Sequence, residues 1–443
     1  MIRHSFLLNI FLFLGFIVLS GTVLNAKTIE QNLKAFDASI DDQFGYSVAI
    51  SNDFAVIGSS KDSILSGESA YYTESGSAYI YQWNKNKWEY KQKLVPDNLK
   101  PHMKFGISVA IENNYIAVGA YEYNNNINGV EIPNSGAVFI FKYNGEEWVQ
   151  DSMLVADDAV ENGDFGFSVS ISGNYLIAGC NMKKPFGAAY IFKNNQGVWT
   201  QQYMITSGND GTWIRFGYSV SIDGDYACVG ARSDSYTRSD LANPVRSGSA
   251  FIFKREDESW VKQKRLIDKT AGTNDLFGSS VSISGNTVLV GAHGNDLFGR
   301  SSGLAYYSIR NETGWSDPVR ITAGEGHLAD FGFGSSVSVS GNILIVGATG
   351  ASGKEEKSGL VYVYGLIGEK IIKINTLSAK DCLAYDLFGS SVGQHGKHII
   401  VGDKFKDSHG AAYIFTIRKN EDVNNDGIVD LTDAVMLIQN LSR

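Results

Sequence analysis

The sequence predicts an all-β fold: a seven-bladed β-propeller built from four-stranded antiparallel blades. The first observation is a block of the form FG-x-S-V that occurs seven times, starting at Phe44, Phe105, Phe165, Phe216, Phe277, Phe333 and Phe388. The second is its spacing, because consecutive copies lie 51 to 61 residues apart. Further apolar runs separated by turn residues follow each copy, and four short strands per repeat of this length are typical of propeller blades.

The first strand of each repeat alternates large and small residues. In the first copy, Phe44, Tyr46, Val48 and Ile50 would share one face, while the glycine, serine and alanine residues between them share the other. A strand near the crowded axis of a propeller is packed on both faces. We therefore expect the large face of one blade to pack against the small face of the next.

The remaining strands of each repeat follow in a regular order. A short polar turn, such as SGN at residues 172–174, leads into an apolar run that ends in glycine, as in AVIG at Ala55. After a connection of variable length comes a third run, as in GSAYIY at Gly76, and in most repeats a tryptophan then opens a fourth, as in WEYKQKL at Trp88. These turns and runs predict antiparallel strands in succession.

The N-terminal segment is predicted to complete the last blade. In six repeats the last apolar residue of the fourth run precedes the next FG phenylalanine by 11 or 12 residues. The seventh repeat has no fourth run, because the chain becomes charged at Arg418, yet Leu33 lies 11 residues before Phe44. A strand ending near Leu33 would join the two ends of the chain and remove open sheet edges.

The composition agrees with a strand-rich fold and argues against one class of partner. The chain has 48 Gly, 22 Tyr and 24 Phe but 6 Pro, and aromatic residues favour strands while glycine favours tight turns. The formal net charge of −9 and the lack of a Lys/Arg cluster give no basic excess to neutralise phosphates. Nucleic acid is therefore not an expected partner.

Residues 1–26 are predicted to be an export signal. Arg3 and His4 precede an apolar run from Phe6 to Leu24, and Ala26 offers a small residue for cleavage. The alternative is an uncleaved anchor, since the run is nearly long enough to span a bilayer. Either way, a secreted or cell-surface protein is expected. The three cysteines are too few and too scattered for a disulfide framework.

These repeats resemble FG-GAP repeats, the units of the seven-bladed head of integrin α subunits and of many bacterial surface proteins. The resemblance rests on the FG opening, the central VGA and the GSAYIF-type strand, and it implies one propeller domain over residues 27–418, expected to be monomeric. Integrin-type repeats carry an aspartate-rich calcium loop between the first two strands, whereas here that connection is a short turn. The chain is therefore closer to the bacterial subclass, and calcium is not expected in the blades.

Residues 419–443 carry a separate calcium signal. The segment DVNNDGIVDLTD has the ligand offsets of an EF-hand loop, with Gly427 at the sharp turn; the expected ligands are Asp422, Asn424, Asp426, the carbonyl of Ile428, Asp430 and Asp433. This loop and the amphipathic helix predicted after it resemble one half of a type I dockerin, which implies bound Ca²⁺ and a cohesin-like partner. Dockerins carry two such repeats and this chain carries one. The alternative is a solvated acidic turn.

No catalytic constellation stands out in the sequence. Residues 389–393 match the GxSxG pattern of a nucleophile, but they fall inside the seventh FG strand rather than on a strand-to-helix turn. His395 and His398 lie in a predicted hairpin without a third metal ligand. The chain is therefore predicted not to be an enzyme. A glycosidase pair of carboxylates that converge from distant blades is the alternative left open.

The connections between second and third strands are the expected ligand-binding elements, because binding residues concentrate on loops held by a rigid scaffold. They run from about 8 residues in the third repeat to nearly 20 in the first, second and fourth, and they open on the same face as the blade-to-blade connections. Their Tyr, Asn and Arg residues suit protein or carbohydrate ligands. The candidates are Tyr71, Tyr72, Tyr121, Tyr123, Arg232, Tyr236 and Arg238.

Two functions follow from these features. The favoured one is a non-enzymatic extracellular binding or adhesion protein that recognises a protein or polysaccharide through the loop-rich face. The other is a component of extracellular polysaccharide breakdown, either an enzyme or a carbohydrate-binding accessory, which the dockerin-like tail suggests.

Overall fold

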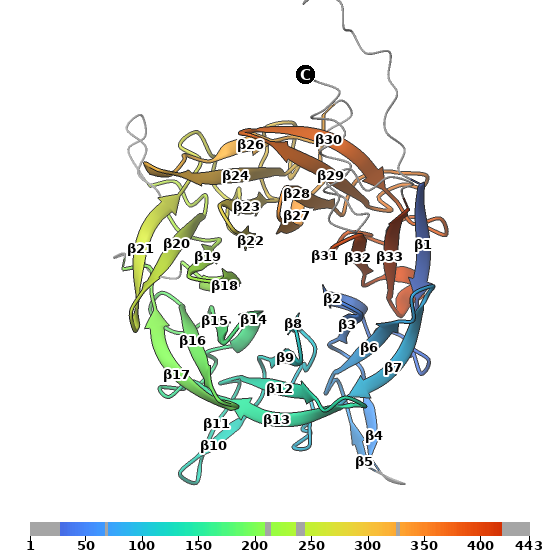
Figure 1. Cartoon of the computed structure of the whole chain (residues 1–443), viewed down its shortest axis with the longest axis vertical. Coiled ribbons are helices and arrows are strands. Elements are labelled where there is room, and N and C mark those ends of the chain that lie inside the picture. The colour runs from blue at the N-terminus through green and yellow to red at the C-terminus, as the bar shows by residue number, and fades with distance from the viewer. Residues whose placement is uncertain (1–26, 67–69, 209–213, 236–243, 325–327, 419–443) are drawn as a thin grey trace, which may run out of the picture.

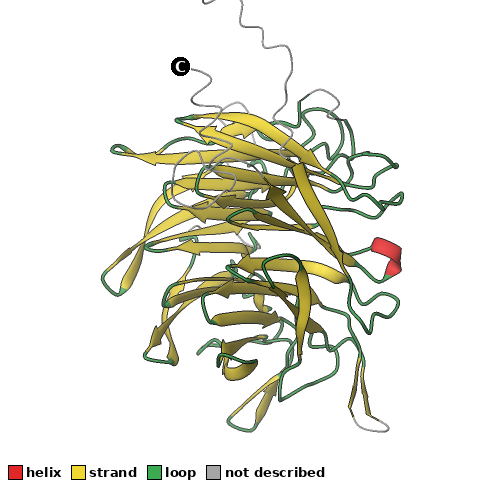
Figure 2. Ribbon diagram, turned by 45° about the vertical axis from the view of Figure 1, so that its right-hand side comes forward, coloured by secondary structure: helices red, strands yellow, loops and turns green. Residues whose placement is uncertain are grey.

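The computed structural model describes residues 27–66, 70–208, 214–235, 244–324 and 328–418. These residues form a ring of seven antiparallel sheets around a central axis (Figure 1). Within this part of the chain the only helical element is a single 3₁₀ turn, η1 (Lys406–Ser408), drawn in red in Figure 2. None of the described residues form a helix long and apolar enough to cross a bilayer. The predicted seven-bladed propeller is confirmed.

Each sheet is one blade with four strand positions, counted outward from the axis. The innermost strands are β2 (Phe44–Ser51), β8 (Ser108–Glu112), β14 (Phe165–Ser172), β18 (Phe216–Asp223), β22 (Ser280–Ser284), β27 (Phe333–Ser340) and β31 (Ser391–His395). The second strands are β3 (Phe54–Ser59), β9 (Tyr115–Ala120), β15 (Tyr175–Cys180), β19 (Tyr226–Ala231), β23 (Thr287–Ala292), β28 (Ile343–Ala348) and β32 (His398–Asp403).

The two outer positions follow the same order. The third strands are β6 (Ser77–Trp83), β12 (Ala137–Tyr143), β16 (Ala188–Asn195), β20 (Ser249–Glu256), β24 (Leu304–Asn311), β29 (Leu360–Ile367) and β33 (Ala411–Arg418). The fourth strands are β7 (Trp88–Leu94), β13 (Trp148–Leu154), β17 (Val198–Ile205), β21 (Ser259–Leu266), the pair β25 (Gly314–Trp315) and β26 (Val319–Ile321), β30 (Lys370–Leu377) and β1 (Lys27–Leu33).

One face of the ring carries longer connections than the other. The connections between second and third strands open there, beside the connections between blades, and we call it the loop-rich face. In blade 1 this connection forms the hairpin β4 (Ile64–Ser66) and β5 (Ala70–Tyr72), and in blade 2 the hairpin β10 (Asn125–Ile127) and β11 (Val130–Ile132). Both hairpins project past the outer strands in Figure 1.

The N-terminal strand closes the ring, as predicted. β1 pairs antiparallel with β33, and Leu33, opposite Ala412, is 2% exposed. The Gln31 side chain donates a hydrogen bond to the Trp88 carbonyl oxygen (2.6 Å) and accepts one from the Trp88 N–H (2.8 Å). Gln92, on the fourth strand of blade 1, makes the same pair of contacts with the tryptophan of blade 2. β1 therefore occupies the place of the missing fourth strand.

Seven hydrogen bonds join neighbouring blades around the axis. In each repeat the serine of FG-x-S donates its Oγ–H to the carbonyl oxygen of the FG glycine in the next blade, at 2.7–3.0 Å. The pairs are Ser47–Gly106, Ser108–Gly166, Ser168–Gly217, Ser219–Gly278, Ser280–Gly334, Ser336–Gly389 and Ser391–Gly45. The last pair connects blade 7 to blade 1, so the set is cyclic.

The blades approach one another so closely that the second strand requires glycine beside this bond. A Cβ atom on Gly230 would lie 2.1 Å from the carbonyl oxygen of Gly278. The same distance is 1.9–2.3 Å for the equivalent glycine of every blade. Glycine in a strand interior commonly marks such an approach of another backbone. The repeated VGA glycine is therefore explained by contact between blades.

The innermost strand departs from the predicted alternation at one position. The ladder between β2 and β3 shifts register between Phe44 and Ser47, so Gly45 and Tyr46 form a bulge. Gly45 has a φ of 89°, which glycine adopts without steric cost. Phe44 and Val48 pack in the core between blades 7 and 1, as expected, whereas Tyr46 is carried out of that face by the bulge.

Leu33→Ala is expected to lower the free energy of unfolding by about 2–5 kcal/mol, because it leaves a cavity under the closing strand. Ile29→Ala on the same strand is the control, since Ile29 is 37% exposed and surface changes usually cost within about 0.5 kcal/mol. Urea unfolding measures both. Equally small losses of unfolding free energy in the two variants would contradict closure of the ring by β1.

Gly230→Ala is expected to lower the free energy of unfolding by about 3 kcal/mol or more, because its Cβ would collide with the neighbouring backbone. Gly224→Ala is the matched control: it lies in a hairpin turn at φ 54° with no atom within 4 Å of an added Cβ, and alanine there costs about 1 kcal/mol. If thermal melting shows the same loss of stability for both variants, neighbouring blades can move apart more easily than the close contact implies.

Candidate ligand-binding site

Two variable positions of the repeat meet at the loop-rich end of the innermost strands. The first is the bulge residue of FG-x-S, which is Tyr46, Ile107, Phe167, Tyr218, Ser279, Ser335 and Ser390 in blades 1 to 7. The second directly follows the second strand and is Ser60, Tyr121, Asn181, Arg232, His293, Thr349 and Lys404. The repeat holds these positions in place while their side chains differ from blade to blade.

Aromatic side chains from three neighbouring blades form a continuous row at this end. The ring centroids of Tyr121 and Phe167 are 5.5 Å apart, and those of Phe167 and Tyr218 are 5.0 Å apart. The guanidinium carbon of Arg232 lies 3.8 Å from the Tyr218 ring centroid, a cation–π contact. We call these four residues, together with Tyr46 and Lys404, the axial cluster.

Blades 7 and 1 complete the axial cluster from another part of the ring. The Lys404 Nζ lies 4.8 Å from the ring centroid of Tyr46. Burial raises the pKa of Tyr46, the nearby Tyr218 hydroxyl raises it further, and the charge of Arg232 opposes this. Tyr46 belongs to blade 1 and both of these residues to blade 4, so their electrostatic effect on Tyr46 reaches across the axis.

The two cations of the axial cluster have no acidic partner among the described residues. Burial lowers the pKa of the Arg232 guanidinium, and burial together with the charge of Lys61 lowers the pKa of the Lys404 ammonium. At the opposite end of the ring, Arg255 also lies over a tyrosine, but it forms an ion pair with Asp225. The axial cluster therefore presents uncompensated positive charge.

Blades 5 and 6 contribute neutral polar groups. The Nδ1 of His293 lies 2.9 Å from the Ser279 Oγ, and the Ser335 Oγ lies 3.0 Å from the Thr349 Oγ1. Burial, with a smaller effect of the Arg232 charge, lowers the pKa of His293 to about 4. The imidazole is therefore neutral near pH 7, and this side of the ring offers hydroxyl and imidazole hydrogen-bonding groups.

Two carboxyl groups lie beside Tyr121. Glu122 follows it in the chain, and Asp164 directly precedes the third FG motif. Burial and the charge of Glu122 raise the pKa of Asp164 to about 7, against the opposing charge of Arg215. A carboxyl group with this pKa exchanges its proton near neutral pH, which suits hydrogen bonding to hydroxyl groups and also acid–base chemistry.

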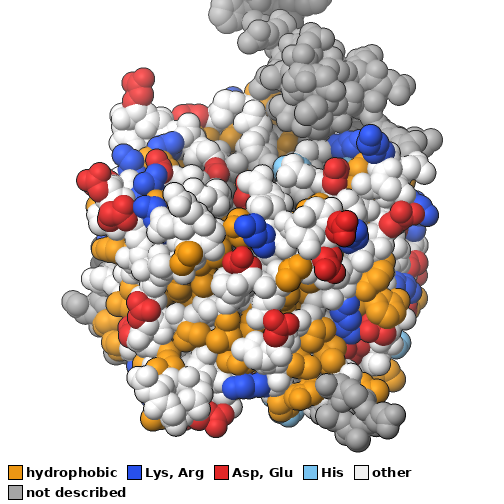
Figure 3. Space-filling view, turned by 60° about the horizontal axis from the view of Figure 1, so that its bottom comes forward, with side chains coloured by type: hydrophobic (Ala, Val, Ile, Leu, Met, Phe, Trp, Pro, Cys, Tyr) orange, Lys and Arg blue, Asp and Glu red, His pale blue; other side chains and the backbone are white. Residues whose placement is uncertain are grey.

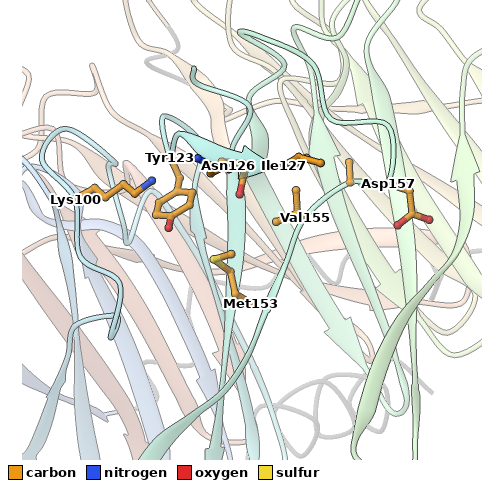
Figure 4. A pocket seen from close by; sticks show the side chains of 9 residues that line it. Lys100, Tyr123, Asn126, Ile127, Met153, Val155 and Asp157 are labelled. Carbon is orange, nitrogen blue, oxygen red and sulfur yellow. The ribbon is translucent and has the colours of Figure 1, made fainter. Parts of the chain in front are cut away.

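A separate cavity of about 450 Å³ lies in blade 2, between the β10–β11 hairpin and the connection that leaves β13 (Figure 4). Lys100 and Tyr123 form one side, Asp157 lies at the other, and Met153 and Val155 lie between them. The Lys100 Nζ is 4.5 Å from the Tyr123 ring centroid. The mixture of apolar and polar groups makes this cavity a second candidate contact area on the loop-rich face.

The structure separates the predicted loop residues from one another. Tyr121 and Arg232 join the axial cluster, whereas Tyr123 is 4% exposed and packs on Phe139 in blade 2, with only part of its ring facing the cavity. Tyr71 and Tyr72 belong to β5, in the hairpin of blade 1. Outside the described residues lie Tyr236, Arg238 and the expected calcium ligands Asp422, Asn424, Asp426, Ile428, Asp430 and Asp433.

The motifs considered for catalysis have structural contacts. Ser391, the serine of GxSxG, donates its Oγ–H to the Gly45 carbonyl oxygen at 2.9 Å and so belongs to the cyclic set between blades. His398 is buried, and its Nδ1 lies 2.9 Å from the Thr416 Oγ1. Among the residues that the structure describes, no group of three or more His, Cys, Asp or Glu side chains is placed to hold a metal ion.

Four residues of the axial cluster were not predicted as a site: Tyr46, Phe167, Tyr218 and Lys404. The available signal was that x varies among aromatic residues, isoleucine and serine inside an otherwise constant FG-x-S-V block. Alternation assigned Tyr46 to the core, because the bulge cannot be read from residue types alone.

In Figure 3, which brings the edge with β10–β11 forward, acidic and basic side chains are interspersed without a continuous basic area.

Comparisons with known proteins agree with this architecture. The chain matches the family model described as FG-GAP repeat at residues 28–81, 88–141, 148–192, 199–253, 260–307, 315–364 and 372–415. Among solved structures, one chain of the "Crystal Structure of Mitotic Checkpoint Complex" is similar, with 10% identity and a TM-score of 0.51, over 88% of this chain and 94% of that one. At that identity the likeness concerns the fold alone. No curated protein matched the chain.

The carboxyl group of Asp403, which directly precedes Lys404, provides a test of the electrostatics at this end of the ring. Asp403 is fully buried, and burial together with the charge of Asp386 raises its pKa to about 9. In the unfolded chain it would ionise near pH 4, so the folded state binds this proton more tightly. Its contribution to stability is therefore full below about pH 4 and is lost as the pH rises toward 9.

Asp403→Asn removes this titration, so the variant is expected to gain stability over the parent protein as the pH rises from 4 to 8. The gain is at most about 1.4 kcal/mol per pH unit, because one pKa unit corresponds to that free energy. Urea unfolding at pH 4, 6 and 8 measures it. A difference between the two proteins that stays constant over this range would show that Asp403 is ionised in the folded state.

Proposed function

The chain belongs to the FG-GAP repeat family, and from this premise we propose that it is an extracellular binding or adhesion protein. It recognises a protein or a polysaccharide through the loop-rich face and is not an enzyme. The axial cluster is the observation that carries this proposal. Aromatic rings and unpaired cations from five blades converge there, and such amphipathic groups dominate recognition surfaces.

The scaffold suits recognition because it holds these side chains before any ligand arrives. The cyclic hydrogen bonds between blades lie one residue after the bulge, as in Ser47 after Tyr46 and Ser219 after Tyr218. Tyrosine and phenylalanine have two side-chain torsions, so little conformational entropy is lost when they bind. A pre-organised contact surface gains affinity through this reduced cost.

The location and the tail form part of the same proposal. An export signal at residues 1–26, cleaved or kept as an anchor, would place the propeller outside the cell. We also propose that the loop starting at Asp422 binds Ca²⁺ through the ligands given above, and that this half-dockerin contacts a cohesin-like partner. Both assignments rest on the sequence.

A second function is favoured by one observation, the carboxyl pair beside the axial cluster. Asp164, with its raised pKa, could act as a general acid, and Glu122 lies close enough to shift that pKa. A carboxyl group with a raised pKa beside a second carboxyl group is an arrangement that glycosidases use. The chain would then be a polysaccharide-degrading enzyme of an extracellular catabolic system.

The proposed function predicts that Tyr46→Ala combined with Tyr218→Ala weakens ligand capture at least tenfold, because each buried aromatic contact contributes about 1–2 kcal/mol or more. The measurement is binding to a polysaccharide array and to a panel of extracellular proteins. Tyr115→Ala combined with Tyr226→Ala is the matched control. A cation also lies over each of these tyrosine rings, but at the opposite end of the ring of blades. Capture that survives the first pair and is lost in the second would place the ligand on the other face.

The two candidate functions are separated by examining captured polysaccharides for products by mass spectrometry. Binding without new reducing ends supports the binding protein. Release of fragments by the parent protein, abolished by Asp164→Asn but not by Asp157→Asn at the blade 2 cavity, would support the enzyme instead.

A further inference from the structure

Partly buried cations without counter-ions are unusual in a folded protein, because burial disfavours their charged form unless a partner compensates. Arg232 and Lys404 are both in this state within the described part of the chain. The Arg232 Nε is also buried without a hydrogen-bond partner. Two cations at the opposite end of the ring also lie near a tyrosine ring but have acidic partners: Lys193 pairs with Glu258 at 3.2 Å, and Arg255 pairs with Asp225.

Arg232 and Lys404 come from blades 4 and 7 and lie at the same end of the ring. Each lies over a tyrosine of the axial cluster, Arg232 over Tyr218 and Lys404 over Tyr46. Arg232 lies 3.8 Å from the Tyr218 ring centroid, and a guanidinium held over an aromatic ring in this way can still donate to a carboxylate.

The groups around these cations suit a sugar. Partly exposed aromatic rings at Tyr46, Phe167 and Tyr218 offer apolar surface for the C–H face of a pyranose. Hydroxyl groups and a neutral imidazole come from blades 5 and 6, and the Asp164 carboxyl lies on the side of blade 3. Groups that can both donate and accept hydrogen bonds match the hydroxyl groups of a sugar.

We propose that the axial cluster binds an acidic sugar residue, with Arg232 holding its carboxylate, the aromatic row contacting its ring and Lys404 adding positive charge at the same end of the ring. This deepens the proposed function and rests on it, since it names the class of ligand that the loop-rich face takes. An acidic peptide could also satisfy the cations, but its acidic side chains do not combine a carboxylate with an apolar ring face and several hydroxyl groups, as an acidic sugar does. The ligand is therefore a uronate- or sialate-bearing polysaccharide.

The test is calorimetric titration of the full chain with oligosaccharides that contain galacturonate, glucuronate or sialic acid, each compared with its neutral counterpart. At least one acidic probe should bind at least tenfold more tightly than its neutral counterpart, since hydrogen bonds to charged groups are stronger than those between neutral groups. Its affinity should fall as NaCl is raised, through screening of the charges. Arg232→Gln should weaken it at least tenfold, and Lys404→Gln should weaken it by a smaller factor.

The matched control is Arg310→Gln combined with Lys142→Gln. Arg310 lies 4.0 Å from the Tyr226 ring centroid and Lys142 lies 5.6 Å from that of Tyr115, both at the other end of the ring. This control should bind the acidic probe as the parent protein does. Melting temperatures of all variants, compared with the parent, show whether a loss of binding reflects unfolding. If Arg232→Gln is unfolded, Arg232→Lys is used in its place, and it is expected to weaken binding of the acidic probe.

Three results would overturn the inference: no binding of any acidic probe, equal binding of acidic and neutral probes, or binding of a glutamate pentapeptide as tight as that of the best oligosaccharide. The proposed function is tested separately by the tyrosine variants. A ligand whose capture needs Tyr46 and Tyr218 but is unchanged in Arg232→Gln and Lys404→Gln would leave the binding protein in place and remove the acidic sugar.

Discussion

The contact between the FG glycine of one blade and the second-strand glycine of the preceding one is the constraint on which the fold depends. It places the carbonyl oxygen of Gly106 at a distance where Gly58 could carry no Cβ, and the Ser47 hydroxyl donates to that same oxygen. Seven such contacts form a closed cycle. Because each blade buries its large face against its neighbour, no blade is a complete core alone, and β1 supplies the fourth strand of the last blade.

This constraint also separates the residues that build the ring from those that can vary. The serine of FG-x-S is fixed by contact with the next blade and the glycine by contact with the preceding one, whereas the residue between them is carried out of the strand by the bulge. Aromatic side chains fill this position in blades 1, 3 and 4 and serine fills it in blades 5, 6 and 7. The ring thus presents an apolar side and a polar side at one end of its axis, with Arg232 of blade 4 and Lys404 of blade 7 adding positive charge.

Much of the architecture could be predicted from the repeat, including the blade count and the closing strand, because the interval of 11 residues before Phe44 matches the interval in the other blades. The candidate site could be predicted only in part. Tyr121 and Arg232 were found because they lie in long connections, but Tyr46 looked like a core residue. Tyr123 looked like an exposed contact residue, yet it packs on Phe139.

The sequence by itself determined the strand order, the positions of the turns and which residues recur, since each of these follows from local spacing and from the alternation of side chains along a strand. Tertiary structure decided which variable residues meet. Tyr46 and Arg232 are 186 positions apart and belong to different blades, and only closure of the ring brings them to one end of the axis. Spacing along a chain describes the path within a blade, whereas convergence across the axis depends on how all seven blades pack.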